Sequence, residues 1–562
     1  MVDPTWPTFH LKVTVLKTKL IPFALLALTQ SIFAQPIPNA GSQMQQLPPS
    51  TVPQKLSPQI EIKPAIAPAA APSDSARLMV SALRVTGAQA YSEAELLALT
   101  GFRPGTEQSL SDLRAMATRI ADHYRRNGYF VAQAYLPAQD IKDGVVTIAV
   151  MEGRFGKVTL NNQTNVSNGL VNNLLGGLQS GDPVVSSSFE TPLLLLSDLP
   201  GVVVKSTLVP GASVGTSDLM VDLTPGRRVS GSIDADNAGN HYTGKYRLGA
   251  TVNYNEPLGL GDVASLRVLT SGKGLNYARG SYQLQFGKAT VGVALSALRY
   301  ELNKEFTGVN GTAQVASVYG SYPLIRTRNT NLYAGLVLDA KKFKDNEELK
   351  KAQVLTASLS GNHRDSLGGG GYSAYSLGLS AGNIDLQTPV VRAFDAITAQ
   401  SNGNFNKLSF SALRLQRVTD SVSLFGAING QVASKNLDSS EKMGLGGMSG
   451  VRAYPQGEAF ADEGYLINLE ARMRLPRFSE KMPGEIELIG FVDTGTVTIN
   501  KNPWTAAGSN RRTLSGAGVG VNWTVSNSFV MKAYYARKIG DEVATSAPDK
   551  SGRFWIQAVK YF

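Results

Sequence analysis

The stretch YLINLEARMRL, residues 465–475, shows the pattern that decides the fold. From its first residue every second position is apolar, and the positions between include Asn468, Glu470 and Arg472. Successive side chains of a β-strand point to opposite sides, so a period of two gives one apolar and one charged face. About ten residues is also the length of a strand that crosses a bilayer at a tilt. We therefore expect a membrane-spanning strand whose charged face meets water.

The same alternation recurs in the C-terminal part of the chain, for example in residues 245–254 and 517–525. A soluble sandwich also alternates, but its strands usually have only about 5–6 residues. We count sixteen candidate strands, near residues 229, 245, 263, 276, 289, 312, 329, 352, 371, 404, 421, 465, 485, 513, 529 and 552. An even number of strands closes into a barrel without a free edge. Residues 227–562 are therefore predicted to form a transmembrane β-barrel of sixteen antiparallel strands.

Composition narrows the classes of protein that remain. The chain has 562 residues, a net charge of +11 and no cysteine. The missing cysteine excludes disulfide scaffolds, thiolate metal sites and cysteine nucleophiles. No apolar run reaches about 18 residues, which excludes a bundle of membrane-spanning helices. A hydrophobic content of 43% resembles that of a soluble chain, but an alternating barrel wall averages its two faces to a similar value.

The N-terminus has the features of an export signal followed by a tether. Lysines precede the apolar run LIPFALLAL at residues 20–28, and Ala34 offers a small residue for cleavage. Residues 1–34 are predicted to be a cleaved signal peptide and not a membrane anchor, because the apolar run is too short to span a bilayer. Residues 35–76 are rich in proline and are expected to form an extended linker, in which only residues 40–47 favour a short helix.

Two similar units separate the linker from the predicted barrel. Residues 77–153 show the order strand, helix, helix, strand, strand, and residues 154–226 repeat this order. Ser109 and Asp112 form a capping-box pattern at the start of the longest helix of the first unit. A repeated supersecondary unit indicates two tandem α/β modules of one kind. We therefore expect three folded domains, two small β-α-α-β-β modules and one barrel.

A long connection between the eleventh and twelfth predicted strands, residues 435–464, carries an unusual motif. A glycine-rich run is followed by Val451, Arg452, Ala453, Tyr454 and Pro455. The thirteenth predicted strand contains FVDTG, in which Asp493 falls on the polar face. An arginine from an infolded loop can pair with this carboxylate through charge-assisted hydrogen bonds in a partly desolvated lumen. The alternative is a solvated loop arginine and an ordinary lumen carboxylate, and the spacing alone favours neither.

Two such modules before a sixteen-strand barrel, with VRAYP and GEAFADEG in the loop and FVDTG in the strand, resemble the outer-membrane transporters of two-partner secretion. This is the haemolysin and filamentous-haemagglutinin secretion family, within the superfamily of barrels preceded by POTRA domains. The resemblance covers roughly residues 77–562. It implies that Arg452 and Asp493 lock the loop in the pore, with Tyr454, Phe491 and Gly495 in the surrounding motifs.

The resemblance also bears on two other segments. Members of this family often place an N-terminal helix in the pore as a plug, and here only residues 40–47 can form one. The family commonly has glycine after the loop arginine, where this chain has Ala453, a small and tolerable change.

These features predict a pore in the outer membrane of a Gram-negative bacterium, with POTRA domains in the periplasm. It would recognise a large secreted exoprotein, such as an adhesin, a haemolysin or a contact-dependent toxin, and pass it unfolded to the cell surface without nucleotide hydrolysis. Pairing with an edge strand would supply the recognition, and the candidate edges contain Tyr129, Val131, Val202 and Val204. The alternatives are a barrel that inserts other barrels into the membrane and, from another class, a passive porin.

We predict no catalytic, cofactor or metal site. His123, His241 and His363 show no triad or metal-ligand spacing, and the glycine run fits neither phosphate-loop nor dinucleotide spacing. The expected partners are the exoprotein and outer-membrane lipids, and no binding of nucleic acid is expected in spite of the net positive charge.

Overall fold

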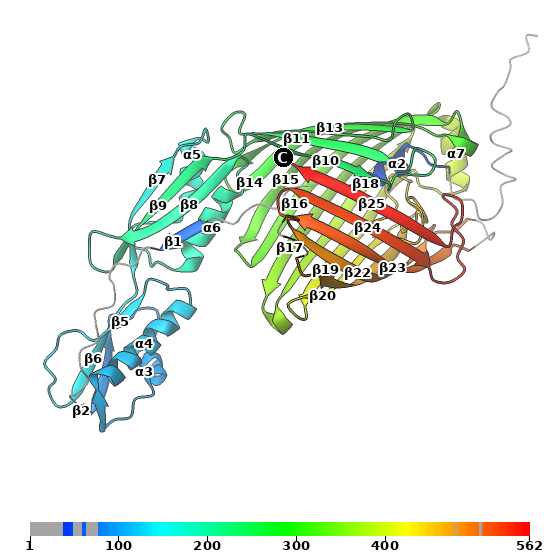
Figure 1. The fold of residues 1–562 in the computed structure, drawn as a ribbon. Coiled ribbons are helices and arrows are strands. Elements are labelled where there is room, and N and C mark those ends of the chain that lie inside the picture. The colour runs from blue at the N-terminus through cyan, green and yellow to red at the C-terminus, as the bar shows by residue number, and fades with distance from the viewer. Residues whose placement is uncertain (1–36, 49–58, 63–76, 478, 480, 505–508) are drawn as a thin grey trace, which may run out of the picture.

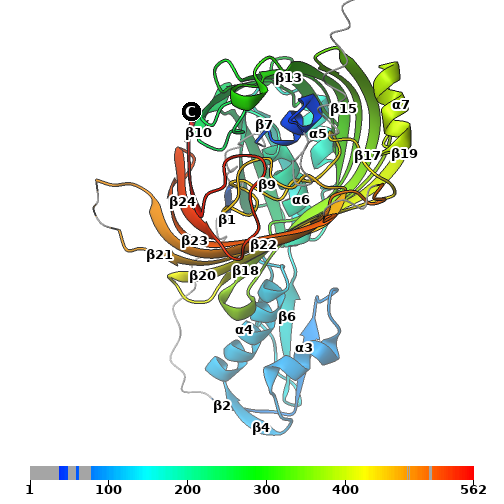
Figure 2. The same ribbon diagram turned by 90° about the vertical axis from the view of Figure 1, so that its right-hand side faces the viewer.

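The structure is a computed structural model that describes residues 37–48, 59–62, 77–477, 479, 481–504 and 509–562. The predicted signal peptide, residues 1–34, lies outside the described residues. The largest part is a closed barrel of sixteen antiparallel strands, β10 to β25 (Figures 1 and 2). The strands are β10 (Val229–Asp236), β11 (Arg247–Asn255), β12 (Val263–Thr270), β13 (Leu275–Phe286), β14 (Ala289–Glu301), β15 (Asn310–Arg326), β16 (Thr330–Asp345), β17 (Glu348–Asp365), β18 (Gly371–Leu386), β19 (Gly403–Arg417), β20 (Val422–Ala433), β21 (Glu463–Arg474), β22 (Glu485–Thr498), β23 (Arg511–Val525), β24 (Phe529–Lys538) and β25 (Gly552–Tyr561).

The barrel closes where its last strand meets its first. β25 pairs antiparallel with β10, so that Ser232 lies opposite Tyr561 and Asp236 opposite Gln557. Closure removes both sheet edges, which would otherwise present unpaired backbone groups to lipid. The prediction of sixteen antiparallel strands is confirmed, and each strand starts within a few residues of its predicted position.

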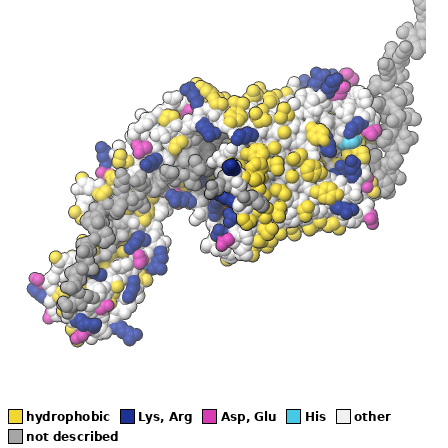
Figure 3. Space-filling model, in the orientation of Figure 1, with side chains coloured by type: hydrophobic (Ala, Val, Ile, Leu, Met, Phe, Trp, Pro, Cys, Tyr) yellow, Lys and Arg dark blue, Asp and Glu magenta, His cyan; other side chains and the backbone are white. Residues whose placement is uncertain are grey.

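The two faces of the barrel wall differ in polarity, as the alternation in the sequence requires. In β14 the outward side chains of Val293 and Leu295 are 53% and 70% exposed, whereas the inward side chains of Leu298 and Tyr300 are buried. Exposed apolar residues recur around the barrel and form the hydrophobic surface that covers its wall in Figure 3. Such a surface is stable against the acyl chains of a bilayer and not against water.

The first module contains two small sheets and two helices. Its elements are β2 (Arg77–Val80), β3 (Ala82–Thr86), α3 (Glu93–Thr100), β4 (Thr106–Ser109), α4 (Leu110–Arg126), β5 (Gln133–Tyr135) and β6 (Val145–Met151). The predicted capping box is present, because Ser109 and Asp112 exchange side-chain and backbone hydrogen bonds at the start of α4. Ile120 and Tyr124 of α4 are fully buried against Ile148 of β6, which fixes the helix on the sheet β3-β6-β5.

Within residues 154–226, the second module has the order strand, helix, helix, strand, strand, without counterparts of β2 and β4. It consists of β7 (Arg154–Asn162), α5 (Asn168–Leu175), α6 (Ser186–Ser197), β8 (Val202–Pro210) and β9 (Thr216–Pro225). Its sheet has the order β1-β8-β9-β7, where β1 (Gln59–Ile62) comes from the proline-rich linker. Leu193 and Leu196 of α6 pack into the core that this sheet covers. A strand from outside the module therefore completes its sheet (Figure 1).

One sequence expectation about the first module needs correction. The segment 129–136 is a strand only over β5, because Tyr129 and Val131 lie in a turn after α4 that is closed by a hydrogen bond from Ala132 N to Tyr129 O. The Tyr129 ring contacts Tyr124 edge to face and so belongs to the module core. Between β18 and β19 the barrel region also contains the helix α7 (Pro389–Ile397).

The linker also contributes a short helix, α2 (Ala40–Gln45), which lies inside the ring of strands (Figure 2). Ala40 is fully buried in a cluster that contains Leu298, Tyr300 and Phe343 from the inner wall. Within the described part of the chain, no helix combines the length and the apolar character needed to span a membrane.

Candidate functional site

The connection between β20 and β21, residues 434–462, folds back into the barrel, and we call it the lumen loop. Its residues Val451, Ala453 and Tyr454 are fully buried, and Pro455 is buried beside them. The Ala453 methyl group lies against Gly516 of β23, where a Cβ atom would approach it to 2.4 Å. The loop is thus packed against the inner wall (Figure 2).

Arg452 of this loop reaches Asp493 of β22 in a bidentate arrangement. Its Nε and Nη2 atoms donate to Asp493 Oδ2 and Oδ1 at 2.9 and 2.7 Å, and its backbone N–H donates to Oδ2 at 3.0 Å. The two residues are only 3% and 0% exposed. Asn468 Nδ2 donates to Oδ1 at 2.8 Å and completes the set of donors around this carboxylate. The structure therefore brings together the two residues that the sequence left as an open pairing.

The Arg452 guanidinium is enclosed by aromatic rings and a second carboxylate. It lies 3.4 Å from the Phe491 ring centroid and 5.0 Å from that of Tyr534, both within range of a cation–π contact. Its Nη1 atom lies 2.8 Å from Glu470 Oε1. Trp555 Nε1 donates to the Arg452 carbonyl at 2.7 Å. Side chain and backbone of this one loop residue are both held by the wall.

The register between β21 and β22 explains why these groups meet. It also gives roles to residues that the sequence pattern left without one. Asn468 is the cross-strand partner of Asp493, and Glu470 is the partner of Phe491. Glu470 was recognised as part of a polar face but received no role, because its alignment with β22 depends on strand pairing. Gly495 belongs to the same motif for a steric reason, since a Cβ there would come within 2.8 Å of Leu445 Cδ2 in the loop.

Glu458 anchors the other end of the lumen loop and was also missed. It is fully buried and lies 2.6 Å from Arg512 Nη1 of β23. Its carboxylate accepts hydrogen bonds from the backbone and hydroxyl groups of Thr545 and Ser546 in the last extracellular loop. Burial alone would raise the pKa of Glu458, but Arg512 and these donors outweigh burial and lower it. The carboxylate therefore stays ionised.

The short helix α2 is attached to the lumen loop and to the wall. The Ala40 N–H donates to Asp345 Oδ1 of β16 at 2.7 Å, and Ser439 Oγ of the loop donates to Asn39 Oδ1 at 2.8 Å. Gln45 donates to the Ser440 carbonyl. Arg247 Nη1 donates to the Gln46 carbonyl at 3.1 Å. Helix and loop thus share one set of contacts at the extracellular end of the barrel.

The two predicted recognition edges differ in the structure. β5 pairs only with β6, so its other side is open. β8 is not a free edge over its central part, because Lys205 to Leu208 pair with β1. Val202 and Val204 precede this paired part, and the Val204 side chain is buried in the module core.

A groove of about 670 Å³ runs between the two modules. One wall contains β5 and the preceding turn, with Val131 and the 45% exposed Tyr135. The opposite wall is formed by the end of β8 and the hairpin tip before β9, which includes the exposed Val214. The open edge of β5 therefore borders a groove that is lined by both apolar and polar residues.

No group of three or more metal-ligating side chains is found among the described residues. The histidines serve other contacts, since His123 packs against Tyr91 and His363 lies 2.8 Å from the Thr330 hydroxyl.

A closed sixteen-strand barrel, a loop held inside it and small α/β modules at its periplasmic end define an outer-membrane transporter for polypeptides. The family described as "Haemolysin secretion/activation protein ShlB/FhaC/HecB" matches residues 215–523, and the ShlB-type POTRA domain matches residues 78–153. The chain belongs to this family of two-partner secretion transporters. It is located in the outer membrane with its POTRA region in the periplasm, and it exports a large secreted exoprotein. Family membership separates it from barrel-inserting proteins and from passive porins.

Individual relatives agree with this placement. The heme/hemopexin transporter protein HuxB of Haemophilus influenzae (strain 86-028NP) is 32% identical over 82% of this chain and 82% of its own length. The outer membrane transporter CdiB of Dickeya dadantii is 24% identical over 74% of each chain. A solved structure of CdiB from Escherichia coli matches 88% of this chain and 93% of its own with a TM-score of 0.65 at 20% identity, which shows a shared fold.

Proposed function

We propose that the contact between Arg452 and Asp493 is a reversible lock that keeps the lumen loop in the pore. The observation that carries this proposal is the bidentate, fully buried pair between a loop residue and a wall residue. A buried pair is stable only while both charges are matched, so displacing the loop requires the arginine to find water or another anion. An exoprotein segment that enters the lumen offers polar groups that can replace Asp493 as the partner of Arg452.

Recognition takes place on the periplasmic side, where residues 77–153 and 154–226 act as two POTRA domains. An extended segment of the exoprotein adds to the open edge of β5 and lies in the groove beside Tyr135 and Val214. Main-chain hydrogen bonds give such an addition affinity for many sequences, and the apolar residues of the groove select for alternate apolar side chains. This mode suits a partner that reaches the transporter unfolded.

The helix α2 acts as a plug that leaves together with the lumen loop. Its contacts with Ser439 and Ser440 couple it to that loop, and its contact with Asp345 holds it to the wall. Outward transport is driven by folding of the exoprotein outside the cell, and the chain carries out no catalytic step. No nucleotide is required.

The lock is tested by the variant Arg452→Ala in cells that produce the full chain. The readout is the set of proteins that reach the medium or the cell surface only when this transporter is present. We expect their export to fall at least tenfold, since the loop loses its defined position. Arg267→Ala is the matched control, because it breaks another buried lumen pair, with Asp234 at 2.9 Å, that does not touch the loop. Unchanged export in Arg452→Ala would contradict the proposal.

The groove is tested by Tyr135→Glu. A carboxylate in the groove disfavours binding of an apolar segment. We expect a loss of about 1.4 kcal/mol in affinity, and therefore a decrease in export by roughly tenfold. Leu110→Glu is the control, because Leu110 has a similar exposure of 40% on the same module and lies outside the groove. Equal export by the two variants would rule out this binding mode.

A further inference from the structure

A row of outward-facing side chains crosses the barrel wall near its extracellular end. Neighbouring strands place these residues directly opposite one another, from β12 to β17: Val268, Ala278, Ala297, Gln314, Lys342 and Lys351. One half of this row is apolar and the other half is polar and basic. Arg299 lies two residues further along β14 than Ala297 and faces the same side.

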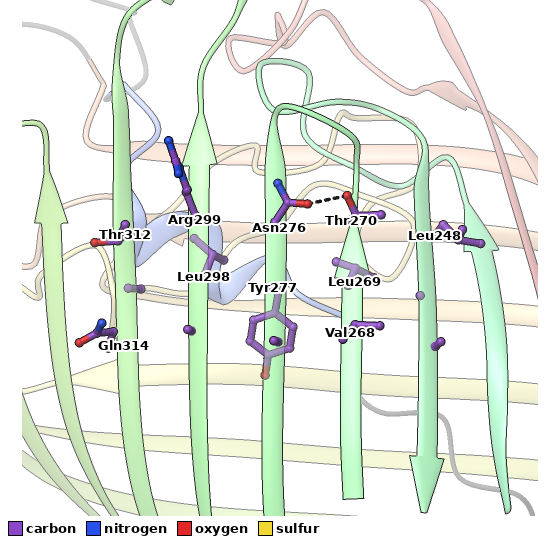
Figure 4. Close-up of a pocket in the computed structure, with 15 residues that line it drawn as sticks. Leu248, Val268, Leu269, Thr270, Asn276, Tyr277, Leu298, Arg299, Thr312 and Gln314 are labelled. Atoms are coloured by element: carbon purple, nitrogen blue, oxygen red, sulfur yellow. Dashed lines mark hydrogen bonds between the residues drawn. The ribbon is translucent and has the colours of Figure 1, made fainter.

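The apolar half of the row borders a depression of about 490 Å³ in the outer surface (Figure 4). Ala278 and Ala297 contribute only methyl groups there, whereas Leu248 and Val268 on one side are larger and 55% and 44% exposed. The lumen side of the same strands is filled, since Leu298 packs in the cluster around α2. The depression therefore opens towards lipid, and its size and apolar lining fit a hydrocarbon chain.

The basic half carries positive charges that protein groups only partly balance. Lys342 lies directly opposite Lys351, and like charges in this position repel each other. Within the described residues, no ion pair joins Lys342, Lys351 or Arg299 to a carboxylate. Three acidic residues lie nearby: Asp385 is opposite Lys351, Glu347 is 3.6 Å from Lys344, and Glu301 lies two residues beyond Arg299 on the same face of β14. The four cations and these three anions leave a net positive surface.

The height of these charges on the wall matches the level of lipid headgroups. Towards the periplasm the outward positions become apolar, as Val318, Leu338 and Leu355 show with exposures of 59%, 51% and 45%. Lysine on the lipid-facing side of a barrel is costly at the middle of the bilayer, and this cost falls to about 0–1 kcal/mol near the interface. The basic half of the row therefore lies at the outer border of the hydrocarbon region, where phosphate groups of lipids are within reach.

We propose that this face binds a phosphorylated glycolipid of the outer leaflet, with an acyl chain in the depression and phosphate groups on Arg299, Lys342 and Lys351. Asn276 and Thr270 at the upper rim are hydrogen-bonded to each other at 2.7 Å and add polar groups near the sugar level (Figure 4). The phosphate between Lys342 and Lys351 removes their repulsion, which a neutral lipid cannot do. This site depends on the barrel wall alone and not on the recognition modules.

The test is co-purification of glycolipid with the full chain from outer membranes in mild detergent, followed by native mass spectrometry. We expect wild-type protein to retain the glycolipid after detergent exchange. Lys342→Gln/Lys351→Gln should retain it about thirtyfold less tightly, since each cation near an anionic surface contributes about 1 kcal/mol. Ala297→Phe fills the depression and should also release the lipid. Lys142→Gln/Lys288→Gln is the matched control, because it removes two exposed cations on the periplasmic side.

Heat-modifiable electrophoretic mobility reports whether each variant still forms a closed barrel. Retention of glycolipid by folded Lys342→Gln/Lys351→Gln at the wild-type level would overturn the proposal. Equal displacement by vesicles of phosphatidylglycerol would overturn the assignment to a glycolipid, because it would show a site for any anionic lipid. Loss of lipid from the control variant to the same extent would show that net charge, and not this row, determines retention.

Discussion

Two elements of this chain are held away from their sequence neighbours, and they are held in different ways. The lumen loop is fixed by side chains, above all Arg452 and Glu458, which form buried ion pairs with Asp493 and Arg512. The linker strand β1 is fixed on β8 through a parallel ladder between main chains. The first contact requires particular residues at particular heights on the wall. The second accepts any residue with a backbone N–H.

This difference matches the different requirements of the proposed gate and of the proposed recognition surface. A gate must have one closed position, and buried charges that match only one partner define such a position. A recognition surface for an unfolded partner must accept many sequences, and strand addition does so. The linker strand shows that one module edge, that of β8, accepts a parallel strand.

The largest expected effect comes from breaking one side of the gate. Asp493→Asn removes the bidentate anion of the buried Arg452 guanidinium and leaves it only the single contact with Glu470. The cost therefore approaches that of a broken buried pair, about 3–5 kcal/mol. We expect the loop to leave its position and the channel conductance in planar bilayers to rise. The double variant Arg452→Leu/Asp493→Leu removes both charges and should raise conductance less than the single variant. If the double variant were the more open of the two, the loop would not be held by a charge pair.

A smaller effect is expected when β1 is removed from β8. Ile60→Pro/Glu61→Pro removes the one N–H of these two neighbours that faces β8, whichever residue carries it, and a net hydrogen bond contributes about 0.5–1.5 kcal/mol. We expect faster hydrogen exchange at the amides of Lys205 to Leu208 and a normal barrel. Ile60→Thr/Glu61→Thr keeps both donors and should exchange as the wild type does. Unchanged protection in the proline variant would show that β1 does not stabilise this edge.

The smallest expected effect is a pH dependence of stability. It arises at Glu256 in the turn between β11 and β12, which lies between the barrel and the second module. Burial, followed by repulsion from Asp262, raises the pKa of Glu256 to about 7, and neither of its carboxylate oxygens has a hydrogen-bond partner among the described residues. A carboxyl group with a raised pKa in the folded state stabilises the fold at low pH and loses this contribution as the pH rises through about 7.

We therefore expect the free energy of unfolding of the wild type to decrease by on the order of 1–2 kcal/mol between pH 5 and pH 8. The melting temperature should fall over the same pH range. Glu256→Gln should remove most of this decrease. Glu347→Gln is the control, because it changes a carboxylate that is 95% exposed. Asp395→Asn is not suitable as a control, because Asp395 accepts several hydrogen bonds. A pH dependence that persists in Glu256→Gln would exclude this residue as its source.

The barrel was predictable from the sequence because every strand repeats a period of two, and the strand starts followed from that pattern. Spacing alone left the contact between Arg452 and Asp493 open, since it does not show whether a loop folds inward, and only the family resemblance implied it. Glu470 and Glu458 were missed because their roles depend on strand register and on the last extracellular loop. The β8 edge was mistaken for a free one, because pairing with a segment more than 140 residues away leaves no local signal.

The central claim is that the lumen loop must leave its position before an exoprotein can pass. The most direct test is Ala453→Cys/Gly516→Cys, in which a disulfide joins loop and wall in a chain that otherwise has no cysteine. The two positions lie closer than the usual Cβ separation of about 3.5–4.5 Å, so the loop shifts by about 1 Å to form the bond. We predict that export stops under oxidising conditions and recovers with a reductant. Full export with the disulfide formed would contradict the account.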